Sequence, residues 1–385
     1  MNLGESIIKI AKSGIRYLYL ILVITLNQFI KIDKSYVVFN SFYGKRIDDS
    51  PRIIYEKLKE KKNNLKCYWV VSRRDKNLEI PYAYQVKKDS LKHIFILLKS
   101  NIWISNSNID LIHGVMVPKG NRIYINTWHG IPFKVLGELE KFISKDDRNW
   151  FKNVKFDYFC ACSEYDRSIF KKVFPSSSGN IVTWGLPRDE IKKEFNKEAL
   201  RKKIGIPDGR RVVLYAPTFR DAVFYERKSK INGLGISELP KWMQYRLENK
   251  FFILYRGHYN SPSTADDMGN YMANVTSYPN IDELMCVSDV LITDYSSILF
   301  DFSLLEKPII LFQYDLGIYM RDRGLYLNPS SLGIPVFFTS QEVFEKLITS
   351  NLETESVSKI KEKFFPENNC SIEKILNVIE METSI

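Results

Sequence analysis

Short apolar runs rich in Val, Ile, Tyr and Phe alternate with longer segments of helical periodicity along most of this chain. Such alternation is typical of a parallel sheet with helices on its faces. The pattern restarts after a polar, basic stretch from Lys192 to Arg211, which contains Gly205, Pro207 and Gly209. The predicted strands are Tyr36–Asn40, Cys67–Ser72, Ile102–Ser105, Arg122–Thr127, Tyr158–Cys162 and Ile181–Trp184 before this stretch, and Val212–Ala216, Phe252–Arg256, Val290–Asp294 and Ile309–Phe312 after it.

The basic stretch predicts a linker between two α/β units, because 385 residues exceed one ordinary hydrophobic core. We expect an N-terminal Rossmann-like lobe over residues 35–207 and a C-terminal one over residues 208–385, which includes the C-terminal helices. The two lobes are expected to face each other across a cleft. Open α/β sheets bind ligands at the carboxyl ends of their strands, so functional residues should directly follow the strands.

Residues 1–34 form a separate segment, predicted to be an amphipathic helix that associates with a membrane surface. Only Tyr17 to Ile30 is free of charge, which is shorter than the roughly 20 residues that a spanning helix needs. No small-residue cleavage site for a secretory signal follows. Five basic and two acidic residues favour an anionic membrane surface. The alternative is a helix that packs on its own protein.

Composition narrows the classes of function. The formal net charge of +11 indicates an anionic partner, such as a phosphorylated substrate, a lipid surface or nucleic acid. The five cysteines are odd in number and sparse, as expected of reduced thiols in a cytosolic protein. The chain has no Walker loop, no HExxH motif, no GxSxG elbow and no zinc-type cysteine cluster. We therefore disfavour P-loop ATP hydrolysis, hydride transfer and zinc hydrolysis, and we predict neither a bound metal nor a cofactor.

His129 follows the predicted strand Arg122–Thr127, between Trp128 and Gly130. A histidine where a strand opens into a loop is placed to meet a substrate, and its ordinary pKa of about 6.5 suits a general base. The alternative is a histidine satisfied within the core. Lys134 adds positive charge nearby, which favours the functional interpretation.

Two strand ends in the second half carry phosphate-binding side chains. Thr218 and Arg220 follow the strand that ends at Ala216. Arg256 and His258 flank Gly257 after the next strand, and glycine lets the backbone approach a ligand closely. Hydroxyl, guanidinium and imidazole groups all bind phosphate oxygens, so both turns are candidate anion sites.

A third strand end gives the strongest signal. The run Val290–Thr293 leads into Asp294, then into Ser296 and Ser297, and then into apolar residues at helical spacing. One of the serines should cap this helix, and the N–H groups at a helix start bind phosphate. The alternative is that the serines satisfy only the helix's own N–H groups. These strand ends together predict a site for a diphosphate.

Several of these motifs, in this order, resemble the CDP-glycerol glycerophosphotransferases of teichoic acid and capsule polymer synthesis. The resemblance rests on these stretches: Thr127-Trp128-His129-Gly130 with Lys134 and Leu136-Gly137, Tyr215–Asp221, Arg256-Gly257-His258, Ile292–Ser297, Asp301-Phe302, Lys307-Pro308, Tyr314-Asp315 and Arg323-Gly324. It implies a GT-B fold, a peripheral position on the cytoplasmic face of the cell membrane, and transfer of an alditol phosphate from a CDP-linked donor with release of CMP.

The resemblance also implies roles for residues. His129 matches the family's proposed base, and we count His258 with it as catalytic. The expected donor-binding residues are Thr218, Arg220, Arg256, His258, Asp294, Ser296 and Ser297. The expected substrates are CDP-glycerol, bound by the lobe of residues 208–385, and a polyprenyl-diphosphate-linked saccharide or polyol-phosphate acceptor, bound by the lobe of residues 35–207.

Alternatives stay open at this point. After Tyr326 the chain departs from the family's usual pattern, with Leu327-Asn328-Pro329, so CDP-ribitol is a second candidate donor. Single addition and polymerisation are both compatible with the motifs. A GT-B glycosyltransferase that uses a nucleotide sugar would share the fold. A non-enzymatic protein that binds nucleic acid or anionic lipid is disfavoured, because the basic runs are interleaved with glutamates at helical spacing, and we expect no nucleic-acid partner.

Overall fold

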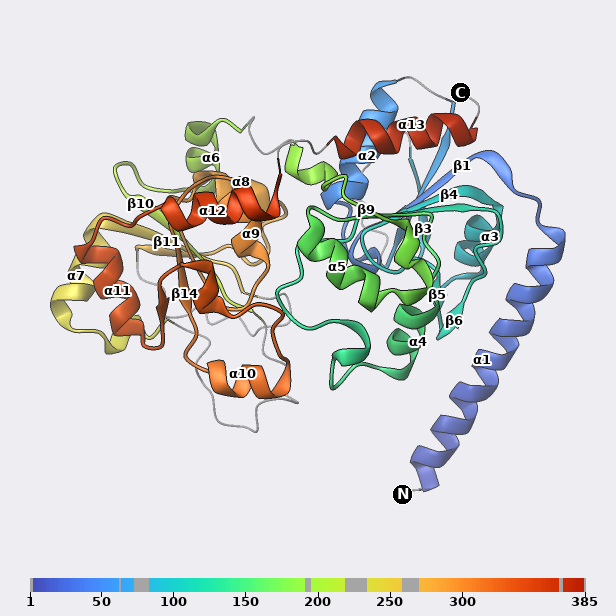
Figure 1. The fold of residues 1–385 in the computed structure, drawn as a ribbon, viewed down its shortest axis with the longest axis horizontal. Coiled ribbons are helices and arrows are strands. Elements are labelled where there is room, and N and C mark those ends of the chain that lie inside the picture. The colour runs from blue at the N-terminus through green and yellow to red at the C-terminus, as the bar shows by residue number, and fades with distance from the viewer. Residues whose placement is uncertain are drawn as a thin grey trace. The chain divides into compact units, whose positions relative to one another are not determined.

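The computed structural model describes residues 3–61, 64–72, 83–190, 195–218, 234–257, 270–366 and 370–383. The chain forms two compact units (Figure 1). Unit 1 contains Met1–His129, Phe142–Glu190 and Asn368–Ile385, and unit 2 contains Gly130–Lys141 and Ile191–Glu367.

Unit 1 is built on a seven-stranded sheet in the order β3-β2-β1-β4-β7-β8-β9, in which every neighbouring pair is parallel. The strands are β1 (Asp33–Asn40), β2 (Lys66–Val71), β3 (Ala83–Lys87), β4 (Ser100–Ser105), β7 (Ile123–Asn126), β8 (Tyr158–Cys160) and β9 (Ile181–Val182). A small antiparallel hairpin, β5 (Leu111–Ile112) with β6 (Val115–Met116), lies outside this sheet. The central strand β4 is buried along its whole length, as expected where helices cover both faces.

Three helices of unit 1 begin at sequence-encoded caps. Ser90 caps α3 (Leu91–Lys99), Ser144 caps α4 (Lys145–Asn153), and Ser163 forms a capping box with Asp166 at α5 (Glu164–Val173). The other helices are α1 (Leu3–Phe29), α2 (Asp49–Glu60) and α13 (Ser371–Thr383).

Unit 2 repeats the architecture with a six-stranded parallel sheet in the order β12-β11-β10-β13-β14-β15. Its strands are β10 (Arg211–Ala216), β11 (Phe251–Tyr255), β12 (Met272–Asn274), β13 (Val290–Thr293), β14 (Ile309–Phe312) and β15 (Val336–Phe337). Its helices are α6 (Lys197–Ile204), α7 (Lys241–Lys250), α8 (Ile281–Val287), α9 (Ile298–Ser303), α10 (Leu316–Asp322), α11 (Ser340–Thr349) and α12 (Glu355–Phe364). Side chains of β10, β11, β13 and β14 pack against α7 and α11 in one hydrophobic core.

All ten predicted strands are present, with ends shifted by a few residues at most. The strands that the sequence did not predict are β3, β12 and β15, together with the two-residue strands of the hairpin. The first three are edge strands, each with a sheet neighbour on one side only, and their residues are partly exposed. Edge strands carry a weaker hydrophobic pattern because one side meets solvent.

The division of the chain differs from the predicted boundary in two places. Helix α13 belongs to unit 1, where it lies beside α2 (Figure 1), whereas we expected the C-terminal helices in the second lobe. Ile375 and Ile379 are fully buried there, and the Asn101 amide donates to the carbonyl of Glu382 at 3.1 Å. Helical periodicity reveals an apolar face but not which sheet that face covers.

The second difference is the segment Gly130–Lys141, which packs with unit 2 although it lies within the first half of the chain. Lys134 forms an antiparallel bridge with Leu325, and the Val135 N–H donates to the carbonyl of Gly324 at 3.2 Å. Gly324 has φ +76°, and a Cβ there would lie 3.1 Å from Val135 Cγ2. The chain thus enters unit 2 directly after His129, and part of the sequence motif around it serves this packing.

The predicted N-terminal helix is present as α1. Val23 is buried, whereas six large apolar side chains are exposed: Tyr17, Leu18, Leu20, Ile21, Ile24 and Phe29. Among the described residues, none of the helices combines the length and the apolar character needed to cross a membrane.

Candidate active site

Both sheets have the strand order of Rossmann folds, so each has a point where the chain's winding reverses. In unit 1 this switch point lies between β1 and β4, and in unit 2 between β10 and β13. Loops that leave neighbouring strands at such a point diverge to opposite faces and leave a crevice for ligands. Most of the predicted site residues that the structure describes follow a strand at or next to one of these points.

In unit 1, buried polar side chains hold together the loops after β1, β4 and β7. The Ser107 hydroxyl donates to Asn40 Oδ1 at 3.1 Å, and the Asn126 amide donates to the Ser107 carbonyl at 2.8 Å. The backbone N–H of Phe42 donates to Asn106 Oδ1 at 2.8 Å, and that of Tyr43 to Ser107 Oγ at 2.9 Å. This network was not predicted, although its signal in the sequence is the set of Ser and Asn residues at the strand ends.

His129 lies directly on this network. Its Nδ1 is 2.7 Å from the carbonyl oxygen of Asn106. Because a carbonyl only accepts hydrogen bonds, the neutral ring carries its proton on Nδ1 and keeps a lone pair on Nε2. This tautomer is the one that a general base requires.

Local backbone geometry sets the orientation of the imidazole. Trp128 adopts φ +52°, an unfavourable conformation for a bulky residue, and its N–H donates to Asn126 Oδ1 at 2.8 Å. The Trp128 indole is buried among Phe151, Phe159, Phe170 and Phe174 and stacks on the His129 ring at 4.3 Å. Strain of this kind persists where the surroundings enforce it, often at functional sites.

A buried carboxylate interacts electrostatically with His129. Asp49, at the start of α2, pairs with Arg188 at 2.8 Å, and both side chains are less than a tenth exposed. Burial opposes the charge of Asp49, but Arg188, the Ser50 N–H and His129 together hold the pKa of that carboxyl below its usual value. The attraction is mutual, so Asp49 stabilises the imidazolium that forms when His129 accepts a proton.

The pKa of the neighbouring Asp48 is shifted in the opposite direction. Burial and the charge of Asp49 raise its pKa to about 7, and Arg46, whose Nη1 lies 3.6 Å away, offsets only part of this. Asp48 Oδ1 is buried without a hydrogen-bond partner.

We therefore expect the variant Asp48→Asn to be more stable than wild type at pH 8, by roughly 1–3 kcal/mol, and nearly equal to it at pH 4. The folded-state pKa of Asp48 is raised, so wild type loses stability as the pH rises from about 4 to about 7, whereas the amide is neutral throughout. Urea unfolding at both pH values measures the difference. A constant difference between pH 4 and pH 8 would contradict the raised pKa.

In unit 2, Asp294 ties two strand ends together at the switch point. Its carboxylate accepts the backbone N–H of Thr218 at 2.9 and 3.1 Å and that of Tyr295 at 2.5 Å, and the residue is 2% exposed. Gln313, at the end of β14, donates to the Asp294 carbonyl at 3.0 Å. The structure thus brings Thr218 and Asp294 together, and it gives Asp294 a structural task that the sequence did not predict.

The paired serines lie at the start of α9, half-buried. Ser297 is the N-cap residue, yet its side chain makes no capping hydrogen bond, whereas Ser296 Oγ accepts the Ile298 N–H at 3.4 Å. The expected cap is therefore weak and comes from Ser296 alone. A hydroxyl that is not needed by the helix is available to a ligand.

Arg256 follows β11, next to β10, and its Nη1 donates to the carbonyls of Tyr278 at 2.8 Å and Val275 at 3.3 Å. The N–H of Gly257 donates to Thr276 Oγ1 at 2.9 Å. These contacts fix the turn after β11. Arg220 and His258 lie outside the described residues, and their roles stay predictions.

Within the described part of the chain, no group of three or more His, Cys, Asp or Glu residues is arranged to hold a metal ion.

Two parallel sheets of Rossmann order place the protein among the GT-B-like α/β folds. The fold is similar to that of the wall teichoic acid polymerase TagF, with a TM-score of 0.82 and 26% identity over 100% of this chain and 99% of that one. TagF in a His→Asn variant with CDPG also matches at a TM-score of 0.82, with 25% identity over 98% of each chain. A UDP-N-acetylglucosamine 2-epimerase from Listeria monocytogenes shares the fold alone, at a TM-score of 0.57 and 10% identity over 89% of this chain and 95% of that one.

The chain belongs to the CDP-glycerol:poly(glycerophosphate) glycerophosphotransferase family, whose model matches residues 22–381. Among curated relatives, the teichoic acid poly(glycerol phosphate) polymerases of Staphylococcus epidermidis and Bacillus subtilis are 32% and 31% identical over 76% and 90% of this chain. The matched part spans 42% and 49% of the length of those two proteins. The teichoic acid glycerol-phosphate transferase of Staphylococcus aureus is 29% identical over 77% of this chain and 78% of its own length.

Proposed function

We propose that this protein transfers glycerol phosphate from CDP-glycerol to a hydroxyl of a teichoic acid acceptor and releases CMP. Membership of the family and the names of the relatives support this class of reaction. The observation that carries the proposal is the hydrogen bond from His129 Nδ1 to the Asn106 carbonyl, because it places the proton of the neutral ring on Nδ1 and so makes Nε2 the basic nitrogen.

In the proposed step, the acceptor oxygen attacks the phosphorus that bears glycerol. A new O–P bond forms, the bond from that phosphorus to the oxygen bridging to the CMP phosphate breaks, and CMP leaves with the bonding electron pair. His129 Nε2 accepts the proton of the acceptor hydroxyl, and Asp49 stabilises the resulting positive charge. Rate enhancement then comes mainly from positioning and from donors prearranged around the charge that builds on CMP.

We infer that the donor's pyrophosphate binds at the switch point of unit 2. The support is the geometry at the ends of β10 and β13, where the Thr218 N–H donates to the buried Asp294 and where Ser296 and Ser297 precede α9. Arg256, Arg220 and His258 complete the proposed donor-binding set, with His258 also a catalytic candidate.

Parallel reactions with CDP-glycerol and CDP-ribitol test the donor. With a lipid-linked teichoic acid acceptor, we expect CMP release and a product heavier by whole glycerol phosphate units from CDP-glycerol, and little product from CDP-ribitol. Mass spectrometry of the product separates the two donors and also distinguishes one added unit from a polymer. Release of UDP or GDP from a sugar donor instead would indicate a glycosyltransferase.

We also propose that the protein lies on the cytoplasmic face of the membrane through α1. The six exposed apolar side chains of α1, from Tyr17 to Phe29, form an apolar surface that an interfacial helix would bury in lipid, with basic residues nearby. The same arrangement suits a lipid-linked acceptor, whose polar head would remain at the membrane surface.

Replacing Leu18, Ile21 and Ile24 together by serine is expected to abolish flotation with vesicles that contain anionic lipid. These side chains are 66%, 46% and 50% exposed, so the fold should tolerate the change. A matched triple serine substitution of Leu139, Trp242 and Phe338, which are 67%, 51% and 53% exposed, controls for the loss of exposed apolar side chains elsewhere. Equal flotation of the serine variant and wild type would remove α1 as the anchor.

A further inference from the structure

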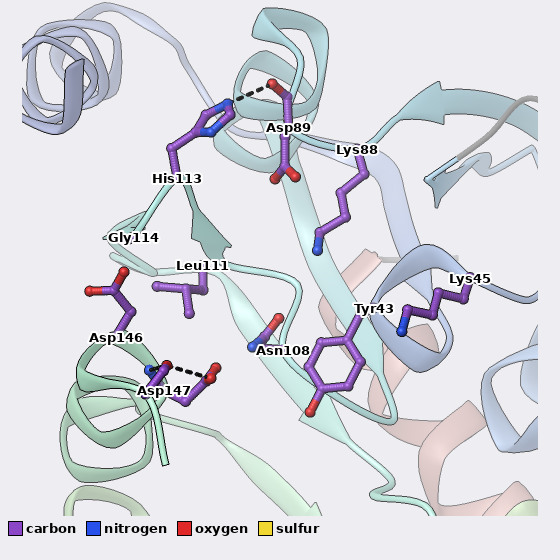
Figure 2. Close-up of a pocket in the computed structure, with 11 residues that line it drawn as sticks. Tyr43, Lys45, Lys88, Asp89, Asn108, Leu111, His113, Gly114, Asp146 and Asp147 are labelled. Atoms are coloured by element: carbon purple, nitrogen blue, oxygen red, sulfur yellow. Dashed lines mark hydrogen bonds between the residues drawn. The ribbon is translucent and has the colours of Figure 1, made fainter. Parts of the chain in front are cut away.

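Unit 1 contains a pocket of about 490 Å³ that is lined by none of the predicted site residues. Its walls come from the loops after β1, β3 and β4, from the β5–β6 hairpin and from the start of α4 (Figure 2). The side chains that matter most for its chemistry are Tyr43, Lys45, Lys88, Asp89, Asn108 and Asp147.

One buried polar atom of this pocket, Asp89 Oδ1, has no hydrogen-bond partner among the described residues. Asn108, which is 5% exposed, lines the same pocket. Figure 2 shows both side chains turned toward the pocket. Buried polar atoms are nearly always satisfied, so a carboxylate oxygen without a partner in a cavity points to a polar ligand.

The backbone of Asp89 strengthens this argument. Asp89 adopts φ +59°, a conformation that non-glycine residues seldom take. Its carbonyl oxygen is 3.2 Å from His113 Nε2, which holds the loop to the hairpin. Asp89 thus keeps an unfavourable backbone conformation while its Oδ1 has no partner among the described residues.

Two lysines and three aspartates line the pocket; Asp146 is paired with Arg16, and Asp147 accepts a hydrogen bond from Ser144. Lys88 lies with its Nζ 6.0 Å from the Tyr43 ring centre, and Lys45 extends toward the same side in Figure 2. Carboxylates and amides form hydrogen bonds with the hydroxyl groups of a sugar or polyol. An exposed aromatic ring packs against the carbon face of such a ligand, and lysines bind phosphate. A phosphorylated saccharide or polyol offers all three kinds of group.

The pocket shares its loops with His129. Tyr43 and Asn108 line the pocket, while Phe42 and Asn106, one and two residues away, contact the histidine. The Phe42 ring centre is 5.7 Å from that of His129, and the Asn106 carbonyl receives the His129 hydrogen bond. A ligand in the pocket would thus lie on the two loops that position the proposed base.

The opposite wall of the pocket adjoins α1. His113 contacts Tyr19 at 4.4 Å between ring centres, and Arg16 pairs with Asp146 at 2.6 Å. Gly114 has φ +76°, and a Cβ there would lie 2.6 Å from Asp146 Oδ2, so glycine permits this close packing of hairpin and helix. A second hollow of about 420 Å³, lined by Arg16, Tyr17 and Leu20 of α1, also includes Gly114.

We propose that this pocket binds the phosphorylated saccharide or polyol head of the acceptor, between the lipid-facing helix α1 and the acceptor hydroxyl at His129. This assignment rests on the proposed function, since that function supplies a lipid-linked acceptor. It adds a subsite of stated chemistry formed by Asp89, Asn108 and Lys88.

The test measures acceptor and donor kinetics separately for Asp89→Asn and Asn108→Ala. Each change removes one or two hydrogen bonds to the ligand, so we expect the KM for a lipid-linked acceptor to rise about tenfold or more, with the KM for CDP-glycerol changed less than twofold. Lys92→Met, an exposed lysine of α3 outside the pocket, is the matched control and should leave both constants unchanged. Unchanged acceptor KM in both pocket variants, with normal transfer, would overturn the subsite and leave the function intact.

Direct binding separates this proposal from the proposed function. Saturation-transfer NMR with glycerol 3-phosphate and glucose 1-phosphate should give signals with wild type and Lys92→Met that are lost in Asp89→Asn, whose shape is conserved. Binding without any transfer from CDP-glycerol would refute the function and keep the pocket. Kinetic effects with the lipid-linked acceptor but no binding of either soluble head would show that the lipid, not the head, is recognised, and would overturn the assignment. Thermal unfolding of each variant confirms that the fold is retained.

Discussion

Replacing His129 by asparagine is expected to lower kcat for the proposed glycerol phosphate transfer by about 10³-fold, within the range usual for loss of a general base. The asparagine amide can still donate to the Asn106 carbonyl, as Nδ1 does at 2.7 Å, but it has no basic nitrogen to replace Nε2. The variant therefore removes the proton acceptor and keeps the anchoring hydrogen bond. CMP release at saturating CDP-glycerol and acceptor measures the effect.

Two controls separate a loss of chemistry from a loss of structure. The Kd of the variant for CDP-glycerol should stay within twofold of wild type, because the proposed donor-binding residues belong to unit 2 and His129 to unit 1. The melting temperature should change little, because His129 is only half-buried. A kcat within tenfold of wild type in a folded variant would exclude His129 as the base.

The position of His129 could be predicted from the sequence, but its chemical state could not. A strand followed by Trp-His-Gly was enough to place the histidine at a strand end. The Asn106 carbonyl that selects its tautomer is 23 residues earlier, and Asp49 belongs to yet another loop. These groups meet because β4 lies between β1 and β7 in the sheet, and periodicity does not reveal strand order.

The strand ends of unit 2 show a different limit. Polar residues after β10, β11 and β13 indicated a ligand site, yet Asp294 binds two backbone N–H groups and Arg256 binds two carbonyls. A polar side chain after a strand can form hydrogen bonds with the backbone of nearby loops or with a ligand, and the same residue types serve both purposes. The pocket beside His129 was not predicted for a related reason, since its walls come from four separate stretches of the chain.

Replacing Arg188 by methionine is expected to destabilise unit 1 by about 3–5 kcal/mol at pH 7, as when one partner of a buried ion pair is removed. Arg188 is 8% exposed, and its guanidinium lies 2.8 Å from Asp49 Oδ2 and 3.7 Å from Asp189 Oδ1. Without the guanidinium, the nearly buried carboxylates of Asp49 and Asp189 lose the positive charge that compensates theirs. Five of the six tryptophans belong to unit 1, so fluorescence during urea unfolding reports mainly on that unit.

Two further variants test whether the burial of the ion pair causes the expected loss of stability: one breaks an exposed ion pair, and the other also removes the charge of Asp49. Arg52→Met breaks the Arg52–Glu56 pair, whose side chains are 52% and 49% exposed, and should cost less than about 1 kcal/mol. Adding Asp49→Asn to Arg188→Met should recover part of the loss, because it removes one unpaired charge.

The stability that Arg188 contributes through Asp49 should depend on pH. Arg188 lowers the folded-state pKa of Asp49, so its stabilisation is present above the unfolded pKa near 3.8 and is lost as the pH falls through the folded value. In Arg188→Met the unpaired carboxylates become protonated at low pH, so the deficit relative to wild type should shrink between pH 7 and pH 4. A deficit that is the same at both pH values would show that Arg188 stabilises the protein by packing rather than by charge.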